Sequence, residues 1–311
     1  MSFSLSARLF SRSKRQLFAL TSTLCLASHA AFWGVLQPAQ ALSKEFEVHF
    51  ALGSDYMERD QYKQAIPEFD AALKNNTDTG AKVAEAYVQR GTAYSSLAKY
   101  DKAIKDLDKG ISINKNSDLG YNNRGALYFR TQHADKAIAD FDQALKLNPK
   151  NKYAAVNRAG CYLLTKDPGK GAKNTLAWLD GHKWTSDFSG HAAVLTALAF
   201  LASGDEQAYQ NVCQTSLKKL DRLKWPFQAF KYFQGKMKDE EVLEEAQDST
   251  YNMTQAQCFM GLHSFFTKKK ADSALKFEFV DKHGTINSVE YWLVKAFLKL
   301  HEKDFSTQPS K

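Results

Sequence analysis

A pattern of five residues recurs three times between residues 46 and 151, always with the same internal spacing. Each copy holds a glycine, a tyrosine, an alanine, a large apolar residue and a small residue, in that order. The copies are Gly53, Tyr56, Ala65, Phe69 and Ala72; Gly91, Tyr94, Ala103, Leu107 and Gly110; and Gly125, Tyr128, Ala137, Phe141 and Ala144. The second and third copies are 34 residues apart, and the first and second are 38 apart. Such self-similarity predicts a solenoid, whose function lies on a surface rather than in a catalytic pocket.

The third copy shows why each unit should be a pair of helices. Tyr121–Phe129 places Tyr121, Gly125 and Tyr128 on one helical stripe, and Asp135–Leu147 does the same with its small and aromatic residues. Asn148-Pro149 closes the unit, because proline cannot continue a helix. One pair cannot bury both of its faces, so stability depends on stacked neighbours.

These residues and their period resemble the tetratricopeptide repeat (TPR) family. The resemblance implies an all-α, right-handed α-solenoid of about seven antiparallel helix pairs and a capping helix. Three clear units are expected at 46–79, 84–117 and 118–151, within 46–151, and a divergent fourth at 152–185, where Gly171 and Thr175 replace the expected alanine and aromatic residue. The interpretation continues with degenerate helical pairs at 186–250, a TPR-like unit with its capping helix at 251–303, and a disordered tail at 304–311.

The C-terminal half carries a second resemblance. Trp225-Pro226, Gly235-Lys236 with an acidic helix, Cys258 with Gly261, and Glu290-Tyr291 follow one another in this order. The order is similar to that in the C-terminal module of bacterial envelope TPR proteins, some of which are lipoprotein adaptors of peptidoglycan hydrolases. It implies an envelope hydrolase or protease as partner. Cys25 follows Thr23-Leu24, so it lacks the small residue that a lipoprotein cysteine needs directly before it. A lipid anchor is therefore not expected.

The N-terminus resembles an export signal. Residues 1–41 hold no acidic residue, four basic ones, an apolar stretch from Leu17 to about Leu36, and Pro38-Ala39-Gln40-Ala41. We interpret 1–41 as a signal peptide cut after Ala41, which predicts a periplasmic or secreted protein. Two alternatives stay open: an uncleaved membrane anchor, since the stretch approaches the ~20 residues that span a bilayer, and an organelle transit peptide.

The remaining chain is only mildly basic. Of 42 Lys and Arg residues, four lie in 1–41, which leaves 38 against 34 acidic residues and a net charge of +4. Lys268-Lys269-Lys270 is expected to be a solvated turn, and no stripe of basic and aromatic residues indicates nucleic-acid binding.

Little in the sequence suggests chemistry. Cys161, Cys213 and Cys258 are an odd number without a short-spaced pair, so we expect small buried apolar side chains, although one disulfide stays open. The histidines lack metal-ligand spacing, and Asp180-Gly181-His182 is expected to be a turn. No phosphate-binding glycine loop or nucleophile elbow occurs. We therefore expect no catalytic residue, no metal and no cofactor.

Three arginines share one position of the repeat. Arg90, Arg124 and Arg158 are 34 residues apart, and Asp106 and Asp140 recur with the same period. We predict ion pairs of Arg90 with Asp106 and of Arg124 with Asp140, in preference to a row of arginines that binds acidic ligands. As exposed pairs they would contribute only ~0–1 kcal/mol each.

The concave face, lined by the first helix of each unit, is the expected binding surface. Its mixture of aromatic, apolar and amide side chains suits an extended peptide or a partner helix. The predicted partner-binding residues are Phe50, Met57, Val88, Asn122, Phe129, Arg130, Tyr153 and Leu163.

The sequence thus predicts an exported, non-catalytic TPR adaptor that binds a protein or peptide, and no nucleic acid. Contact with a membrane would occur only through an uncleaved N-terminal segment. Two alternatives remain: self-assembly, for example as a homodimer, and a helical enzyme with a site in residues 185–247.

Overall fold

The computed structural model describes residues 43–74, 80–185, 188–286 and 288–305. The predicted signal peptide, the linker at 75–79 and residues 306–311 of the predicted tail lie outside the described residues.

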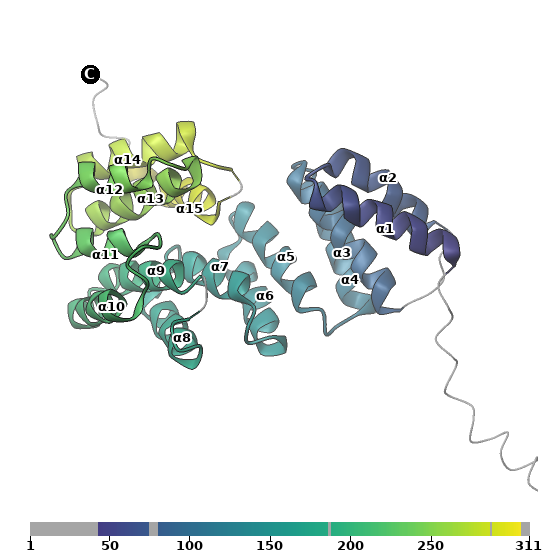
Figure 1. The fold of residues 1–311 in the computed structure, drawn as a ribbon, viewed down its shortest axis with the longest axis horizontal. Helices are drawn as coiled ribbons and strands as arrows, with labels where there is room; N and C mark the ends of the chain where they lie inside the picture. Colours follow the sequence, from purple (N-terminus) through teal and green to yellow (C-terminus); the bar gives the residue numbers. More distant parts are fainter. Residues whose placement is uncertain (1–42, 75–79, 186–187, 287, 306–311) are drawn as a thin grey trace, which may run out of the picture. The chain divides into compact units, whose positions relative to one another are not determined.

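The described part of the chain is all-helical, with sixteen helices and no strand (Figure 1). Consecutive helices form seven antiparallel pairs, followed by α15 and the short α16, which confirms the predicted α-solenoid of about seven pairs with a capping helix. The bounds are α1 Lys44–Glu58, α2 Tyr62–Leu73, α3 Ala81–Ser96, α4 Tyr100–Ile113, α5 Asp118–Arg130, α6 Ala134–Leu147, α7 Lys152–Tyr162, α8 Pro168–Gly181, α9 Ser189–Ala202, α10 Glu206–Lys219, α11 Phe227–Phe233, α12 Asp239–Ala246, α13 Thr250–Phe266, α14 Lys270–His283, α15 Val289–Leu300 and α16 Glu302–Phe305.

Side-chain caps define where several helices begin. The Ser117 hydroxyl accepts from the Gly120 amide, Asn151 from Ala154, and Asp205 from Ala208. Such caps satisfy amide groups that the first helical turn leaves without partners. Helix α10 ends at Lys219, and Pro226 occupies the N-cap position of α11 without a side-chain cap.

A shared turn closes six of the seven pairs. Seven residues after the repeat's glycine position lies a residue with positive φ, and the next amide donates to the carbonyl five residues back, as at many helix C-termini. The positive-φ residues are Asp60, Ala98, Gln132, Gly204, Gly235 and Lys268. The corresponding amide bonds are Gln61 to Tyr56, Lys99 to Tyr94, His133 to Tyr128, Asp205 to Phe200, Lys236 to Lys231 and Lys269 to Ser264. Among the described residues, only the α7–α8 pair closes differently.

Within each clear unit the glycine admits a large side chain of the second helix, sixteen residues later. A Cβ added to Gly125 would lie 2.9 Å from Phe141 Cε1, and one on Gly53 would lie 2.7 Å from Phe69 Cε1. Gly261 and Phe277 form the same contact in α13–α14 at 2.6 Å. Contacts this short leave no room for a methyl group, so the ring and the glycine together set how closely the two helices approach.

The fourth unit holds different residues at these two positions. Its glycine position is Ala159 and its aromatic position is Thr175, and both are buried, so the first residue is larger and the second is smaller than in the clear units. In the structure α8 runs from Pro168 to Gly181, and a Cβ on Gly171 would lie only 2.1 Å from Tyr162 Cγ. Glycine at 171 therefore makes room for the Tyr162 ring.

Two smaller expectations are confirmed. Cys161, Cys213 and Cys258 are free, buried and helical, and burial raises the pKa of each thiol. Lys268, Lys269 and Lys270 are exposed where α13 turns into α14. Of the helices described, none is both long and apolar enough to cross a membrane.

The packing of Gly171 gives a test that separates sterics from helix propensity. Gly171→Ala should lower the free energy of unfolding by about 1–3 kcal/mol, because the methyl group collides with Tyr162. Gly181→Ala, in the same helix, should not destabilise, because its Cβ meets nothing within 4 Å. Urea denaturation measures both. Equal effects of the two substitutions would contradict the packing account.

Candidate functional site

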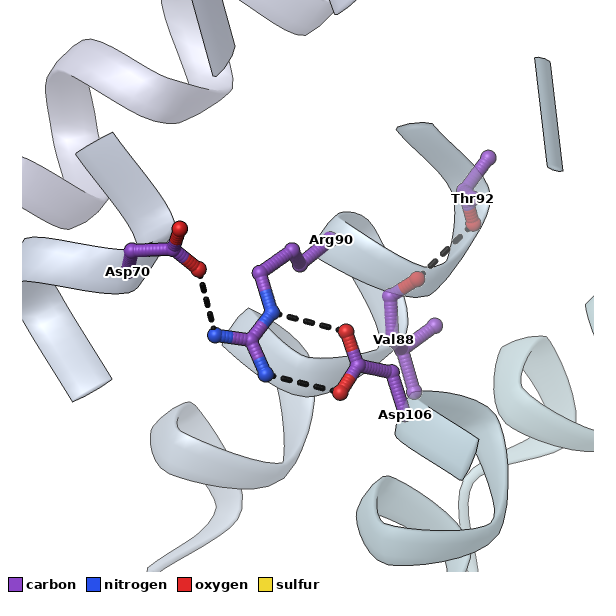
Figure 2. Close-up of polar contacts among 5 residues, drawn as sticks. All are labelled: Asp70, Val88, Arg90, Thr92 and Asp106. Carbon is purple, nitrogen blue, oxygen red and sulfur yellow. Dashed lines mark hydrogen bonds and ion pairs between the residues drawn. The ribbon is translucent and has the colours of Figure 1, made fainter. Parts of the chain in front are cut away.

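The repeated arginines link the second helices of neighbouring units. Arg90 on α3 binds Asp106 on α4 through Nε and Nη2, and its Nη1 donates to Asp70 on α2, with all three distances at 2.7 Å (Figure 2). Arg124 repeats the arrangement one unit later, with Asp140 and Asp108. The predicted pairs Arg90–Asp106 and Arg124–Asp140 are confirmed.

These pairs differ from the expectation in two ways. Asp106 and Asp140 are each only 6% exposed, so they are not surface pairs. The contacts to Asp70 and Asp108 also cross from one unit to the preceding one. They were not predicted, although Asp108 and Asp142 recur 34 residues apart. Each guanidinium therefore joins three helices, and Arg90 and Arg124 are engaged within the protein rather than offered to a ligand.

The arginine arrangement is reduced in the fourth unit. Arg158 donates to Asp142 of the preceding unit at 2.6 Å, but Asn174 stands where its own aspartate would be. Arg158 Nε is buried without a hydrogen-bond partner. The series of bridges thus ends where the side-chain repeat becomes degenerate.

A hollow of about 680 Å³ lies against the first helices of units one to three. We call it the N-terminal hollow. Its lining comes from α1, α3, the α4–α5 connection and the start of α5: Met57, Ala81, Lys82, Glu85, Val88, Gln89, Thr92, Asn114, Asn116, Ser117, Asp118, Leu119 and Asn123. The volume is that of a typical ligand pocket, although the lining is more polar than most.

Amide side chains recur at one register position of the first helices. Gln89, Asn123 and Asn157 are 34 residues apart; the first two line the N-terminal hollow, and Asn157 lines the pocket described next. Ser54 Oγ donates to Gln89 Oε1, and Asn123 Nδ2 donates to Thr92 Oγ1. These bonds hold each amide in place and still leave it with donor or acceptor capacity.

A second site forms because the C-terminal helix returns to the middle of the solenoid. Helix α15 packs against α5 and α7, and Arg130 at the end of α5 lies over the Trp292 ring at 5.7 Å. A pocket of about 220 Å³ remains between α5, α7, the start of α9, α13 and α15. This C-terminal pocket is lined by Ala126, Phe129, Arg130, Tyr153, Val156, Asn157, Phe188, His191, Tyr251, Ser288, Val289, Glu290 and Trp292.

Gln255 organises buried polar groups beside this pocket. The Trp225 indole N–H donates to Gln255 Oε1 at 2.7 Å, and the Gln255 amide nitrogen donates to Glu290 Oε1 at 3.0 Å. His191 Nε2 lies 2.9 Å from the same Gln255 oxygen and must therefore carry a proton. In neutral His191 the other nitrogen, Nδ1, is then an acceptor.

The protonation of this network follows from burial. Glu290 is fully buried, which raises its pKa to about 7 against the opposing effect of its hydrogen bonds, including that from Gln255. Burial lowers the pKa of His191, while its bond to Gln255 acts in the opposite sense. The histidine is therefore neutral near pH 7, and Glu290 keeps its proton to a higher pH than an exposed glutamate.

The eight predicted partner-binding residues divide into three groups. Met57 and Val88 line the N-terminal hollow, and Phe129, Arg130 and Tyr153 line the C-terminal pocket. The others lie elsewhere: Phe50 stacks on Phe46, Asn122 is buried in α5, and Leu163 is buried in the core with 4% exposed. Whether any of the eight binds a partner stays a prediction.

Several lining residues were not anticipated. His191 and Glu290 carried no site signal of their own, although Glu290 belongs to the series of residues from Trp225 to Tyr291. Leu119, 56% exposed at the start of α5, lies outside the five-residue pattern. In the described part of the chain, no group of three or more His, Cys, Asp or Glu residues could hold a metal ion.

Comparison with known proteins identifies the repeat. Residues 84–117 and 119–151 match the tetratricopeptide repeat family model, so the chain contains TPR units. A search of curated proteins found no match.

Among solved structures, a tetratricopeptide repeat protein from Parabacteroides merdae is similar over 82% of this chain and 100% of its own, with 16% identity and a TM-score of 0.56. The Arabidopsis OM64 TPR domain is 31% identical over 36% of this chain and 90% of its own, with a TM-score of 0.34. YrrB, described as a TPR protein with an unusual peptide-binding site, is 13% identical over 64% of this chain and 100% of its own, with a TM-score of 0.49. Only the first TM-score exceeds 0.5, and at this identity it shows the fold alone.

The arginine bridges predict unequal effects of two aspartates on one arginine. Asp140→Asn should lower the free energy of unfolding by about 2 kcal/mol, because it weakens a charge-assisted pair on the largely buried Arg124. Asp108→Asn should cost less than about 1 kcal/mol, since Asp108 is half exposed. Chemical denaturation of both variants tests this, and a larger cost for Asp108→Asn would contradict the assignment.

Glu290 predicts a pH-dependent stability. The pKa of Glu290 is raised in the folded state. At pH 4 the carboxyl is protonated in both the folded and the unfolded state, so its burial does not lower the free energy of unfolding. The free energy of unfolding then falls as pH rises through about 7. The shift corresponds to about 3 kcal/mol by pH 8. Glu290→Gln should remove this component, so the variant should gain stability relative to wild type between pH 4 and pH 8. A constant difference across that range would contradict a buried, titrating Glu290.

Proposed function

We propose that the chain is an exported, non-catalytic TPR adaptor that binds an extended peptide segment of a partner protein in the N-terminal hollow. The observation that carries this proposal is the hollow itself, with Gln89 and Asn123 in its wall and the exposed Leu119 at its edge.

The chemistry of the lining suits a peptide backbone. An extended peptide presents alternating N–H and C=O groups, and amide side chains can both donate and accept hydrogen bonds. Gln89 and Asn123 lie one repeat apart, so they can meet such groups at successive points along the segment. Thr92 and Ser117 add hydroxyls to the same wall.

The apolar and charged parts of the hollow would select among peptides. Met57, Val88 and Leu119 offer apolar contacts, of which Leu119 is the most exposed. Lys82, Glu85 and Asp118 place both signs of charge around them. Mixed charge favours a particular pattern in the ligand over a uniformly acidic or basic one.

Export and the partner's class belong to the same proposal. The acid-free N-terminus supports export, and the motif from Trp225 to Tyr291 supports an envelope hydrolase or protease as partner. The bridged arginines and the unreactive, buried thiols support a role without catalysis.

Paired substitutions test the binding surface. Peptides selected from a random displayed library against the full chain should bind Leu119→Asp at least about tenfold more weakly, because a buried leucine contact contributes roughly 1.5–3 kcal/mol. Leu275→Asp is the matched control, since Leu275 is 69% exposed on α14 and outside the hollow. Fluorescence polarisation measures both. Peptides that bind Leu119→Asp as tightly as wild type would contradict the proposed surface.

Export has its own test. A full chain with a C-terminal tag, expressed in a Gram-negative host, should appear in the periplasmic fraction with Leu42 as its first residue by mass spectrometry. A chain that keeps residues 1–41 and stays with the membrane would support an uncleaved anchor instead.

A further inference from the structure

The C-terminal pocket has two hydrogen-bond acceptors without donors. Glu290 Oε2 and His191 Nδ1 are both buried and unpartnered, while their other polar atoms bond to Gln255. Both residues line the pocket. A buried acceptor without a donor costs free energy, so two at one site indicate that a donor from outside the chain completes them.

The same pocket contains a cation without an acid. Arg130 lines it, and no ion pair joins Arg130 to a carboxylate in the part of the chain that is described. Arg124 and Arg158, on either side in sequence, each bind at least one aspartate. Arg130 lies over the face of Trp292 at 5.7 Å. Burial lowers its pKa, while the nearby Tyr100 and Tyr62 side chains act in the opposite sense.

Aromatic rings surround the space between these groups. Tyr153 packs edge-on against Phe188 at 5.1 Å, and Tyr251 and Trp292 complete the ring-lined wall. Lys152 already lies over the faces of Tyr153 and Phe188, at 5.6 Å and 4.8 Å, as Arg130 does over Trp292, so these rings face the chain's own cations. The volume of about 220 Å³ suits a small ligand rather than a folded partner.

We propose that the C-terminal pocket binds a small zwitterion, an α-amino acid or a short peptide with free termini. Its ammonium donates to Glu290 Oε2 and His191 Nδ1, and its carboxylate accepts from Arg130. A simple amine would face the uncompensated charge of Arg130, and a simple carboxylate would face Glu290. A ligand with both charges satisfies both ends of the pocket.

Binding would also tie distant helices together. Glu290 lies on α15, His191 on α9 and Arg130 on α5. A ligand bound by all three residues stabilises the packing of α15 against α5 of the third unit. This site shares no lining residue with the N-terminal hollow, so the inference stands independently of peptide binding there.

The test starts with the wild-type full chain. Each of the twenty L-amino acids and the corresponding glycyl dipeptides is added in differential scanning fluorimetry, and compounds that raise Tm are measured by calorimetry. At least one should bind. Its N-acetyl and its C-terminal amide derivatives should each bind at least about tenfold more weakly, since each lacks one charge. Binding of free amino acids would assign a metabolite as ligand, and binding of dipeptides alone would assign a peptide terminus.

Substitutions then locate the site. Glu290→Gln and Arg130→Gln should each weaken binding at least about tenfold, while Glu240→Gln and Arg222→Gln, exposed and remote from the pocket, should leave it unchanged. Circular dichroism checks that each variant is folded. The comparison of the blocked derivatives uses the wild-type chain and therefore does not depend on the folding of any variant. The proposal is overturned if no compound binds at about 10 mM, a very weak affinity, or if blocking either charge leaves affinity unchanged. Unaltered binding by both site variants would overturn it equally.

Discussion

The contact between the first-helix glycine and the second-helix side chain sixteen residues later sets the geometry of the clear units. In three pairs the glycine lies against a phenylalanine, at Gly53–Phe69, Gly125–Phe141 and Gly261–Phe277, and in a fourth it lies against Leu107. The turn between the two helices has its positive-φ residue seven positions after the glycine. Arg90 and Asp106, also sixteen apart, then meet across the same pair of helices. The repeat residues therefore build the scaffold, and binding is left to the positions between them.

The two candidate sites arise from different parts of this geometry. The N-terminal hollow is a direct product of the repeat, because equivalent positions of α3 and α5 line it: Gln89 with Asn123, and Glu85 with Leu119. The C-terminal pocket arises where the repeat ends and α15 packs against α5 and α7. The degenerate half contributes Glu290 to this pocket, and Trp225, Gln255 and Glu290 form one connected network. The repeat contributes Arg130 and Asn157. The sequence half with the weakest repeat thus holds the most buried polar chemistry.

The sequence predicted the fold well where side chains repeat. It missed the shared turn of α9–α10, because the equivalent packing positions hold Ala197 and Cys213, which give no glycine and aromatic signal, while the backbone turn at Gly204 is retained. It placed Leu163 on the concave face, whereas Leu163 is packed in the core with 4% exposed. Periodicity indicates which face of a helix points inward, but it does not tell which later helix will cover that face.

The fourth unit offers the most direct test of the account, because it carries the alternative pair Ala159 and Thr175. The measurement is a double-mutant cycle in the third unit, with Gly125→Ala, Phe141→Thr and both together, followed by urea denaturation of the full chain. If the two positions jointly set how closely the helices approach, the double variant should lose less free energy of unfolding than the two single variants added together. The difference should be at least about 1 kcal/mol. Additive losses would contradict the claim that this contact fixes the repeat.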